Sequence, residues 1–166
     1  MEIRSAQAID VDGINEVGNY YIQHTPANFK LEVLNTQERL EWMKGFSETG
    51  RHQLIVGVEG ETVLGYACST EFHERCAYQT SVATTIYLRP EIRQQGLGSQ
   101  LYSELFNRLK KEDLNRAFAG ITLPNEGSVA IHKKFGFTEI GIFSQAGQKY
   151  GEYWDVLWME KALQSQ

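Results

Sequence analysis

A glycine-rich turn is the clearest candidate for ligand chemistry. Arg93, Gly96 and Gly98 form an R-x-x-G-x-G pattern between a β-rich segment and a helix-like segment. Glycines lack a Cβ atom, so their backbone N–H groups can approach a diphosphate closely, and the following helix N-terminus adds partial positive charge. The alternative is a tight strand-to-helix turn that needs glycine only for its dihedral angles. The pattern alone leaves both interpretations open.

Two common phosphate motifs do not fit this turn. The third glycine of the dinucleotide pattern G-x-G-x-x-G falls on Leu101, which disfavours a Rossmann site. The turn also lacks the G-K-[ST] sequence of a P-loop. Its chemistry must therefore be judged from the segments around it.

A second polar segment begins at Asn125 and carries Ser128 and His132. These two residues are four positions apart, which places them on one face of a helix. On its own this spacing is typical of a histidine that bonds to its own helix, and a hydrolase triad is disfavoured because no G-x-S-x-G elbow is present. Cys68, His73 and Cys76 are only three soft ligands, so we expect no metal site, and two cysteines are too few for a disulfide framework.

The elements that must position these residues alternate between helical and β patterns. Residues 1–5 predict a strand, and Asp10 caps a helix whose apolar positions are Ile14, Val17, Tyr21 and Ile22. After a loop at 24–34, Asn35 and Glu38 form a capping box for a helix with apolar residues from Leu40 to Phe46. Strands are predicted at 54–58 and 62–72, joined by a turn at Glu59-Gly60.

The second half repeats this alternation. A strand at 81–88, the glycine turn, a helix with Leu101, Leu105 and Leu109, and a strand at 116–123 form a βαβ-like unit. A short helix follows from Asn125 to Phe135 and ends at Gly136. Strands at 137–143 and 153–159 complete the order βαα, βββ, α, β, α, ββ.

Composition predicts one compact domain over residues 1–166. The formal net charge of −5 disfavours nucleic acid as a partner. No apolar run is long enough to cross a membrane, and the first residues lack the apolar core of a signal peptide. We therefore expect a soluble cytoplasmic protein without a membrane partner.

The strand with an apolar end, the R-x-x-G-x-G turn and the N-x-x-S helix ending in Gly-Phe resemble the GNAT superfamily of N-acetyltransferases. The order of elements agrees with that superfamily over the whole chain. Within it, the sequence is similar to the phosphinothricin and methionine-sulfone acetyltransferase group, through Asn28-Phe29, Ala77-Tyr78, Leu97-Gly98-Ser99, Leu123-Pro124-Asn125, His132 and Gly147-x-Lys149-x-Gly151-x-x-x-Asp155-Val156. The resemblance implies an α/β fold with a mixed central sheet, flanking helices and a cofactor gap between two splayed strands.

The same resemblance implies acetyl-CoA as co-substrate, bound between the strands that end near Leu88 and Leu123. Backbone groups of Ile86, Tyr87 and Leu88 would pair with the pantetheine arm, and an N–H near Leu88 would stabilise the oxyanion. Asn125 would face the thioester. The pyrophosphate would lie on the turn formed by Arg93, Gln94, Gln95, Gly96, Leu97, Gly98 and Ser99.

The resemblance also assigns catalytic and substrate residues. His132 stands where many members of the superfamily carry a tyrosine thought to protonate the leaving thiolate. Arg75 matches the position of an arginine that faces the substrate carboxylate, a role suited to a guanidinium. Tyr78 and Phe29 would also contact the substrate.

One position departs from the subgroup. Ala83 stands where the subgroup usually has a glutamate that helps to deprotonate or position the amine. A water chain through Tyr78 or Thr85, a carboxylate from Glu32 or Glu71, or a different substrate would account for its absence. The sequence leaves these open.

The sequence therefore predicts transfer of acetyl from acetyl-CoA to the amino group of a small amino-acid-like substrate, of the phosphinothricin, methionine sulfone or sulfoximine type, by direct attack. The alternatives are another amine, such as a peptide N-terminus or a polyamine, and a non-catalytic module that binds acetyl-CoA. The resemblance also implies a homodimer.

Overall fold

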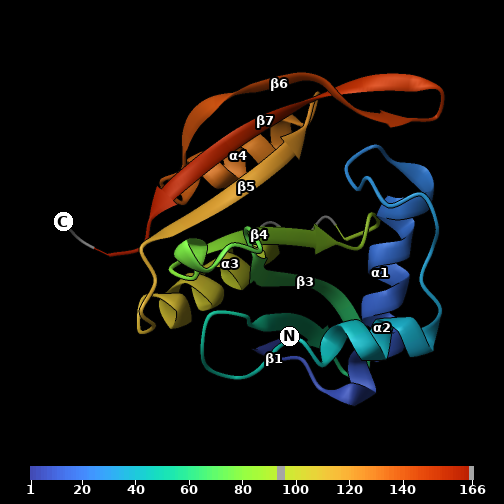
Figure 1. The fold of residues 1–166 in the computed structure, drawn as a ribbon. Coiled ribbons are helices and arrows are strands. Elements are labelled where there is room, and N and C mark those ends of the chain that lie inside the picture. Colours follow the sequence, from blue (N-terminus) through green and yellow to red (C-terminus); the bar gives the residue numbers. More distant parts are fainter. Residues whose placement is uncertain (93–95, 165–166) are drawn as a thin grey trace.

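The computed structural model describes residues 1–92 and 96–164. Seven strands form one mixed sheet in the order β1-β2-β3-β4-β5-β7-β6 (Figure 1). The elements are β1 (Glu2–Ser5), η1 (Ala8–Asp10), α1 (Val11–His24), α2 (Thr36–Met43), β2 (Leu54–Glu59), β3 (Thr62–Glu71), η2 (Cys76–Tyr78), β4 (Ser81–Leu88), α3 (Leu97–Leu109), β5 (Arg116–Thr122), α4 (Glu126–Lys134), β6 (Thr138–Lys149) and β7 (Glu152–Ala162). The predicted α/β class and order of elements are confirmed.

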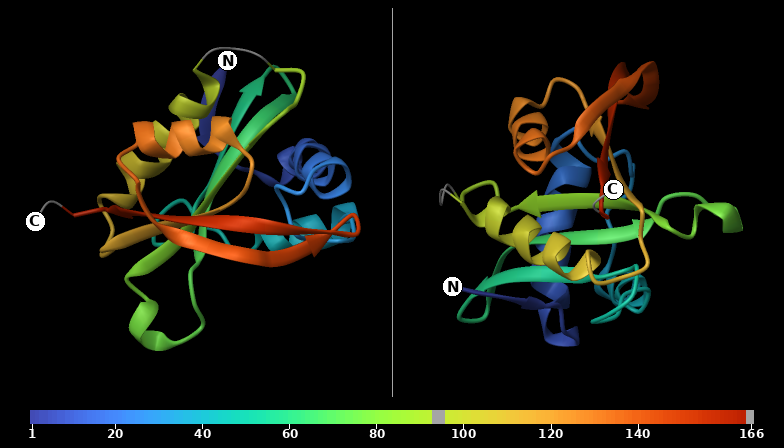
Figure 2. Two further views of the ribbon diagram at one scale, coloured as in Figure 1. Left: turned by 90° about the horizontal axis from the view of Figure 1, so that it is seen from above. Right: turned by 90° about the vertical axis from the view of Figure 1, so that its left-hand side faces the viewer.

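The sheet opens in its middle, between β4 and β5. These parallel strands pair only where residues 81–83 meet residues 116–118. Beyond this point β4 continues along β3 to Leu88, while β5 continues along β7 to Thr122. Figure 2 shows the two halves of the sheet diverging from the shared pair. The splayed strands expected from the sequence are therefore present.

Helices cover both faces of the β1–β4 half. On one face α3 buries Leu101, Leu105 and Leu109, the three positions predicted from its periodicity. On the other face α1 buries Ile14 and Val17 against alternate residues of β2 and β3. Successive strand side chains point to opposite faces, so both helices contribute to hydrophobic burial without competing for the same surface.

Two local predictions near the N-terminus have different outcomes. The capping box is confirmed, because the Asn35 side chain accepts from the Glu38 N–H and the Glu38 carboxylate accepts from the Asn35 N–H. The predicted second helix is too long at its end: α2 stops at Met43, and Phe46 lies in the turn that follows. Phe46 still packs edge-on against Trp42, which explains the apolar pattern without a longer helix.

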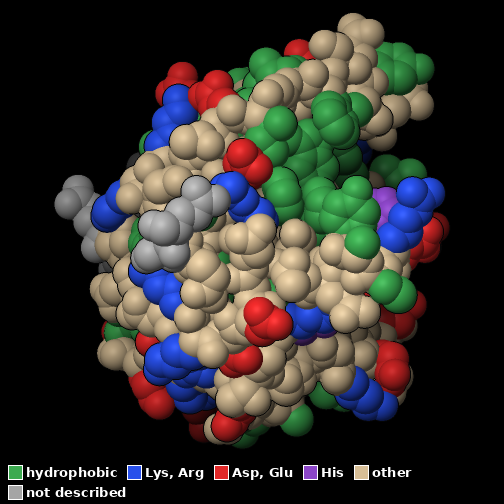
Figure 3. Space-filling model, turned by 60° about the vertical axis from the view of Figure 1, so that its left-hand side comes forward, with side chains coloured by type: hydrophobic (Ala, Val, Ile, Leu, Met, Phe, Trp, Pro, Cys, Tyr) green, Lys and Arg blue, Asp and Glu red, His purple; other side chains and the backbone are tan. Residues whose placement is uncertain are grey.

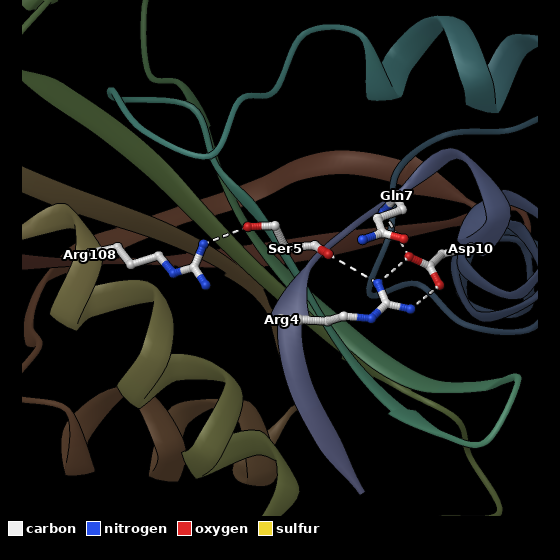
Figure 4. Close-up of polar contacts among 5 residues, drawn as sticks. All are labelled: Arg4, Ser5, Gln7, Asp10 and Arg108. Atoms are coloured by element: carbon white, nitrogen blue, oxygen red, sulfur yellow. Dashed lines mark hydrogen bonds and ion pairs between the residues drawn. The ribbon is translucent and has the colours of Figure 1, made fainter.

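Polar contacts tie β1 to the helices on both sides (Figure 4). Arg4 forms an ion pair with Asp10 at 2.7 Å, and the Gln7 N–H also donates to this carboxylate. Burial would raise the pKa of Asp10, but these donors together lower it below its ordinary value. From α3, Arg108 donates to the Ser5 hydroxyl at 2.6 Å.

The C-terminal hairpin is longer than its predicted strands, 137–143 and 153–159. β6 and β7 extend to a tight turn at Tyr150 and Gly151, both with positive φ. The pairing register shifts between Phe143 and Gly147, around Gln145 at φ 54°. This bulge breaks the two-residue alternation on which the strand prediction relied.

Candidate active site

The gap between β4 and β5 contains a cavity of about 380 Å³. Its walls are the diverging residues of β4 and β5, the start of α4 and the end of α1, and they include residues 84–88, residues 119–122, Asn125, Ser128, His132 and Tyr21. Figure 3 shows hydrophobic side chains gathered between the hairpin at the top of the view and the body of the molecule below it. A narrow, partly apolar slot of this kind suits an extended ligand.

The backbone of β4 presents hydrogen-bonding groups to this cavity. The Arg89 N–H donates to the Leu64 carbonyl of β3 at 2.8 Å, and backbone groups of an antiparallel strand alternate in direction. The backbone of Tyr87 therefore faces β3, whereas Ile86 and Leu88 face the gap. The Leu88 carbonyl accepts from the Tyr21 hydroxyl at 2.8 Å, and the Leu88 N–H points into the slot. Tyr87 lines the cavity through its side chain.

The glycine turn leads into α3 at one end of the gap. Gly96 is the helix N-cap at φ +105°, a conformation that favours glycine, so the dihedral interpretation holds for this residue. A Cβ atom on Gly98 would lie 2.9 Å from Ile131 of α4, so Gly98 permits close packing of α3. Arg93, Gln94 and Gln95 lie outside the described residues.

The first turn of α3 also carries Leu97 and Ser99. Leu97 is buried in the core below the turn. The Ser99 hydroxyl accepts from Nζ of Lys134 at 2.7 Å, which places a cation beside the helix N-terminus. Backbone N–H groups and a nearby ammonium are an arrangement suited to a phosphate group.

Helix α4 positions Asn125, its N-cap, and His132, in its last turn, on the cavity wall. The Asn125 side chain caps the helix by accepting from the Ser128 N–H at 3.1 Å. Nδ1 of His132 lies 2.7 Å from the Ser128 carbonyl, which can only accept, so Nδ1 carries the proton. Nε2 then accepts from the Tyr102 hydroxyl at 2.9 Å. His132 is therefore a neutral imidazole in one tautomer.

Burial lowers the pKa of His132, although its bond to the Ser128 carbonyl works in the opposite direction. Burial raises the pKa of the fully buried Tyr102, which keeps its hydroxyl protonated as the donor to His132. The cavity wall thus includes a neutral imidazole, and the Tyr102 hydroxyl donates to its Nε2, the atom that can accept a proton.

A second cavity, of about 540 Å³, lies between α2, the 27–30 loop and the β6–β7 hairpin. It shares Thr84, Thr85 and Tyr87 of β4, and Gly120 and Thr122 of β5, with the first cavity. The two cavities therefore meet through the opening in the sheet. Ala83 and Phe29 line the second cavity.

Other residues proposed for the substrate lie elsewhere. Arg75 is the N-cap of η2 and Tyr78 is its last residue. Both are exposed and absent from the described lining of both cavities. Tyr78 packs on Phe72 and His73 instead. Glu32 and Glu71 are exposed and are also not part of either lining. Of the alternatives for proton removal, Thr85 is the residue that reaches both cavities.

Comparisons with known proteins fit this geometry. Residues 18–137 match the model of the acetyltransferase (GNAT) family. The chain belongs to this family. A phosphinothricin N-acetyltransferase of Streptomyces coelicolor is 39% identical over 98% of this chain and 96% of that protein. An L-methionine sulfoximine/L-methionine sulfone acetyltransferase of Salmonella typhimurium is 29% identical over 98% of this chain and 95% of that protein.

The structure of the yncA protein of Salmonella typhimurium with its cofactor acetyl-CoA aligns with this chain at a TM-score of 0.94. It is 28% identical, and the alignment covers 100% of this chain and 95% of that protein. The GNAT fold and the N-acetyltransferase class predicted from the sequence are thereby confirmed. The expectation of acetyl-CoA as co-substrate has the same support.

The contacts of three polar residues in this GNAT chain are not predicted by any local sequence pattern. The bond between Tyr102 and His132 joins residues 30 positions apart, so no local motif indicates it. Arg39 of α2 lines the second cavity although no local motif marks it. Lys149 belongs to the Gly147-x-Lys149-x-Gly151 match, but this pattern does not indicate that its Nζ donates to distant backbone carbonyls.

Proposed function

We propose that this chain transfers an acetyl group from acetyl-CoA to the primary amine of a small amino-acid-like substrate by direct attack. The observation that supports this most strongly is the unpaired part of β4 and β5, which opens into a cavity on each side. Two reactants can enter from opposite sides and meet at shared residues. Holding both in one complex replaces an encounter in solution by a reaction within a single site.

The residues of the first cavity fit acetyl-CoA. The Ile86 and Leu88 backbone faces the slot, and the α3 N-terminus with Lys134 offers donors for a diphosphate. When bound, acetyl-CoA supplies an activated thioester. The Leu88 N–H is positioned to donate to the oxygen of the acetyl carbonyl as negative charge develops. Asn125 lies on the same wall, near the shared residues.

Attack by the amine forms the C–N bond and breaks the C–S bond, so the nitrogen loses a proton and the leaving CoA thiolate gains one. We assign His132 as the group that accepts the amine proton and returns it to the thiolate. Among the described titratable side chains of the first cavity, the other two are Tyr21 and Tyr87, whose pKa values are raised by burial. Neutral His132 accepts a proton at Nε2 once the Tyr102 hydroxyl no longer donates to this nitrogen. The Thr85 hydroxyl, which lines both cavities, is placed to relay through water.

The substrates named for the relatives indicate the acceptors to test first. We propose amino acids with an oxygen-rich side chain, of the phosphinothricin, methionine sulfone or methionine sulfoximine type. The second cavity supports this choice because the rings of Phe29, Trp42 and Trp158 surround it, while Lys30 and Arg39 add positive charge. No aspartate or glutamate occurs in its described lining.

The test is thiol release from acetyl-CoA with L-phosphinothricin, L-methionine sulfone, L-methionine sulfoximine, an alanyl dipeptide and spermidine. Turnover of the three amino acids at kcat/KM values at least tenfold above the other amines is expected. Preference for the dipeptide or spermidine would assign another amine. Acetyl-CoA binding by calorimetry with no turnover of any amine would assign a binding module.

We further propose that the protein is a cytoplasmic homodimer. Ile140, Ile142 and Phe143 of the edge strand β6 are each more than half exposed, which leaves apolar surface beside a free strand edge. Both cysteines are free, which suits a reducing compartment. Within the described residues, no helix is long and apolar enough to cross a membrane. Light scattering of the purified protein, with Ile142→Lys as the dimer-disrupting variant, tests the assembly.

A further inference from the structure

The second cavity contains a buried cation that the proposed reaction does not use. Arg39 is 4% exposed and lines the cavity together with Trp42 and Tyr66. Its guanidinium carbon lies 4.8 Å from the centre of the Trp42 ring. Its Nε–H donates to the Asn15 side chain at 3.1 Å, which ties α2 to α1. Two contacts therefore hold Arg39 in place: the hydrogen bond from its Nε–H to Asn15, and the packing of its guanidinium over the Trp42 ring.

The charge of Arg39 is not balanced within the part of the chain that the structure describes. No carboxylate there lies within ion-pair distance, whereas Arg4 pairs with Asp10 at 2.7 Å. A guanidinium has five N–H donors. Asn15 accepts one, and the Tyr66 hydroxyl lies beside the group as a second acceptor. A buried charge without a partner is costly, so a partner from outside the chain would be stabilising.

Lys149 shows that the fold can satisfy a buried cation when the role is structural. Its Nζ donates to the carbonyls of Ile22, Thr25 and Asn28, one for each of its three N–H groups. Arg39 lacks such a set and faces a cavity instead. The buried indole N–H of Trp158, which lines the same cavity, is also without an acceptor among the described residues. The second cavity therefore holds two donor groups, the Arg39 guanidinium and the Trp158 indole N–H, that lack a full set of acceptors among the described residues.

The position of Arg39 relative to the opening in the sheet indicates which substrate group it meets. Tyr87 lines both cavities, the Tyr66 ring packs against it at 5.7 Å between centroids, and Arg39 lies beyond Tyr66. An amine that reacts at the opening would place its own α-carboxylate within two bonds of the nitrogen. Arg39 is farther from the opening, on the side where an amino-acid side chain would extend.

We propose that Arg39 is a specificity residue that binds an anionic oxygen acid at the side-chain end of the amine substrate. This inference rests on the proposed function. A phosphinate matches the guanidinium because its two oxygens can accept two parallel N–H bonds. The site therefore favours an acidic side-chain end over a neutral one of similar size.

The test compares L-phosphinothricin with L-methionine sulfone, which share the α-amino and α-carboxylate groups but differ in the charge of the side-chain end. Arg39→Gln is expected to raise KM for phosphinothricin at least tenfold and KM for the sulfone less than threefold, with KM for acetyl-CoA unchanged. Arg39→Lys, which keeps the charge but loses the planar fork, should fall between the parent and Arg39→Gln on phosphinothricin. If Arg39→Gln does not fold, the comparison of Arg39→Lys with the parent on the two substrates carries the test.

Three results separate the possible failures. Equal losses on both substrates would show that Arg39 only shapes the cavity or binds the α-carboxylate, and would overturn the assignment. A parent protein that acetylates the sulfone but disfavours phosphinothricin would also overturn it, while leaving the proposed function intact. A parent that acetylates neither amino acid would overturn the proposed function itself.

Discussion

His132 is kept neutral by its burial, and hydrogen bonds at both ring nitrogens fix its tautomer. The Ser128 carbonyl fixes the proton on Nδ1, and Tyr102 covers Nε2. Burial lowers the pKa of His132, so the folded state resists protonation at a pH where the unfolded chain, with a pKa of about 6.5, accepts a proton. This difference makes the stability of the fold depend on pH.

We predict that the free energy of unfolding falls as pH is lowered below about 6.5, by at most about 1.4 kcal/mol per pH unit for this one proton. The sign follows because the unfolded state binds more protons than the folded state in this range. Urea denaturation at several pH values measures it. His132→Asn should reduce the slope. His52→Gln should also reduce it, because burial also lowers the pKa of His52. Equal slopes for His132→Asn and the parent would contradict the assignment.

Ala83 is the second residue at which chemistry can be altered locally. It lines the second cavity, whose described wall contains no carboxylate. We predict that Ala83→Glu raises kcat/KM for an amino acid that the parent already acetylates by about tenfold, with the pH profile shifted toward acid, because a carboxylate near the amine accepts its proton. Ala83→Gln is the control of equal size. A folded variant with unchanged acetyl-CoA affinity but slower turnover at every pH would show that alanine is adapted to a different substrate.

At the scale of elements, one lysine connects the β6–β7 hairpin to the end of α1 and the loop that follows it. Lys149 of β6 donates to carbonyls at the end of α1 and in the following loop, which carries Asn28 and Phe29 of the second cavity. Burial lowers the pKa of this ammonium, but three acceptors hold it in place. A Cβ atom on Gly147 would lie 2.2 Å from the Phe29 ring, so the same segment also packs directly on the loop.

We predict that Lys149→Met lowers the free energy of unfolding by about 2 kcal/mol, because carbonyls that bond to a charged donor lose it. It should also raise KM for the amine more than KM for acetyl-CoA, since the loop forms part of the amine cavity. Lys149→Arg, which keeps the charge, is the matched variant. Chemical denaturation and initial-rate kinetics measure both effects. An equal rise in both KM values would argue against a specific link to the amine cavity.

Local patterns predicted the elements and the turn, but not the contacts between distant residues. The Asn35 capping box and the α3 periodicity depend on neighbours within four positions, and both are confirmed. The bond between Tyr102 and His132 and the exposure of Arg39 to a cavity arise only when helices pack against the sheet. The hairpin was predicted too short because the bulge near Gln145 breaks the alternation of side chains.

At the scale of the whole molecule, the diverging halves of the sheet allow the two reactants to approach from opposite sides. The first cavity is lined by β4, β5, α4 and the end of α1, whereas α2, β3, the 27–30 loop and the hairpin contribute most of the rest of the second cavity. Among the described residues, the two linings share Ala27 and the residues of β4 and β5 at the opening. Substitutions at residues that line only the second cavity can therefore change its shape and charge without changing the edge of β4.

The two cavities also bear on whether the acetyl group is first transferred to a side chain of the protein before it reaches the amine. Cys68 is the one cysteine that lines either cavity among the described residues, and burial raises the pKa of its thiol to about 12. The nucleophilic thiolate is therefore scarcely populated near neutral pH. We predict intersecting initial-velocity lines, no acetyl adduct on the protein by mass spectrometry after incubation with acetyl-CoA alone, and a kcat for Cys68→Ala within about threefold of the parent. Cys76→Ala is the control for the exposed thiol. Parallel lines with an acetyl adduct lost in Cys68→Ala would establish a covalent intermediate, and the opening in the sheet would then serve two successive half-reactions rather than one ternary complex.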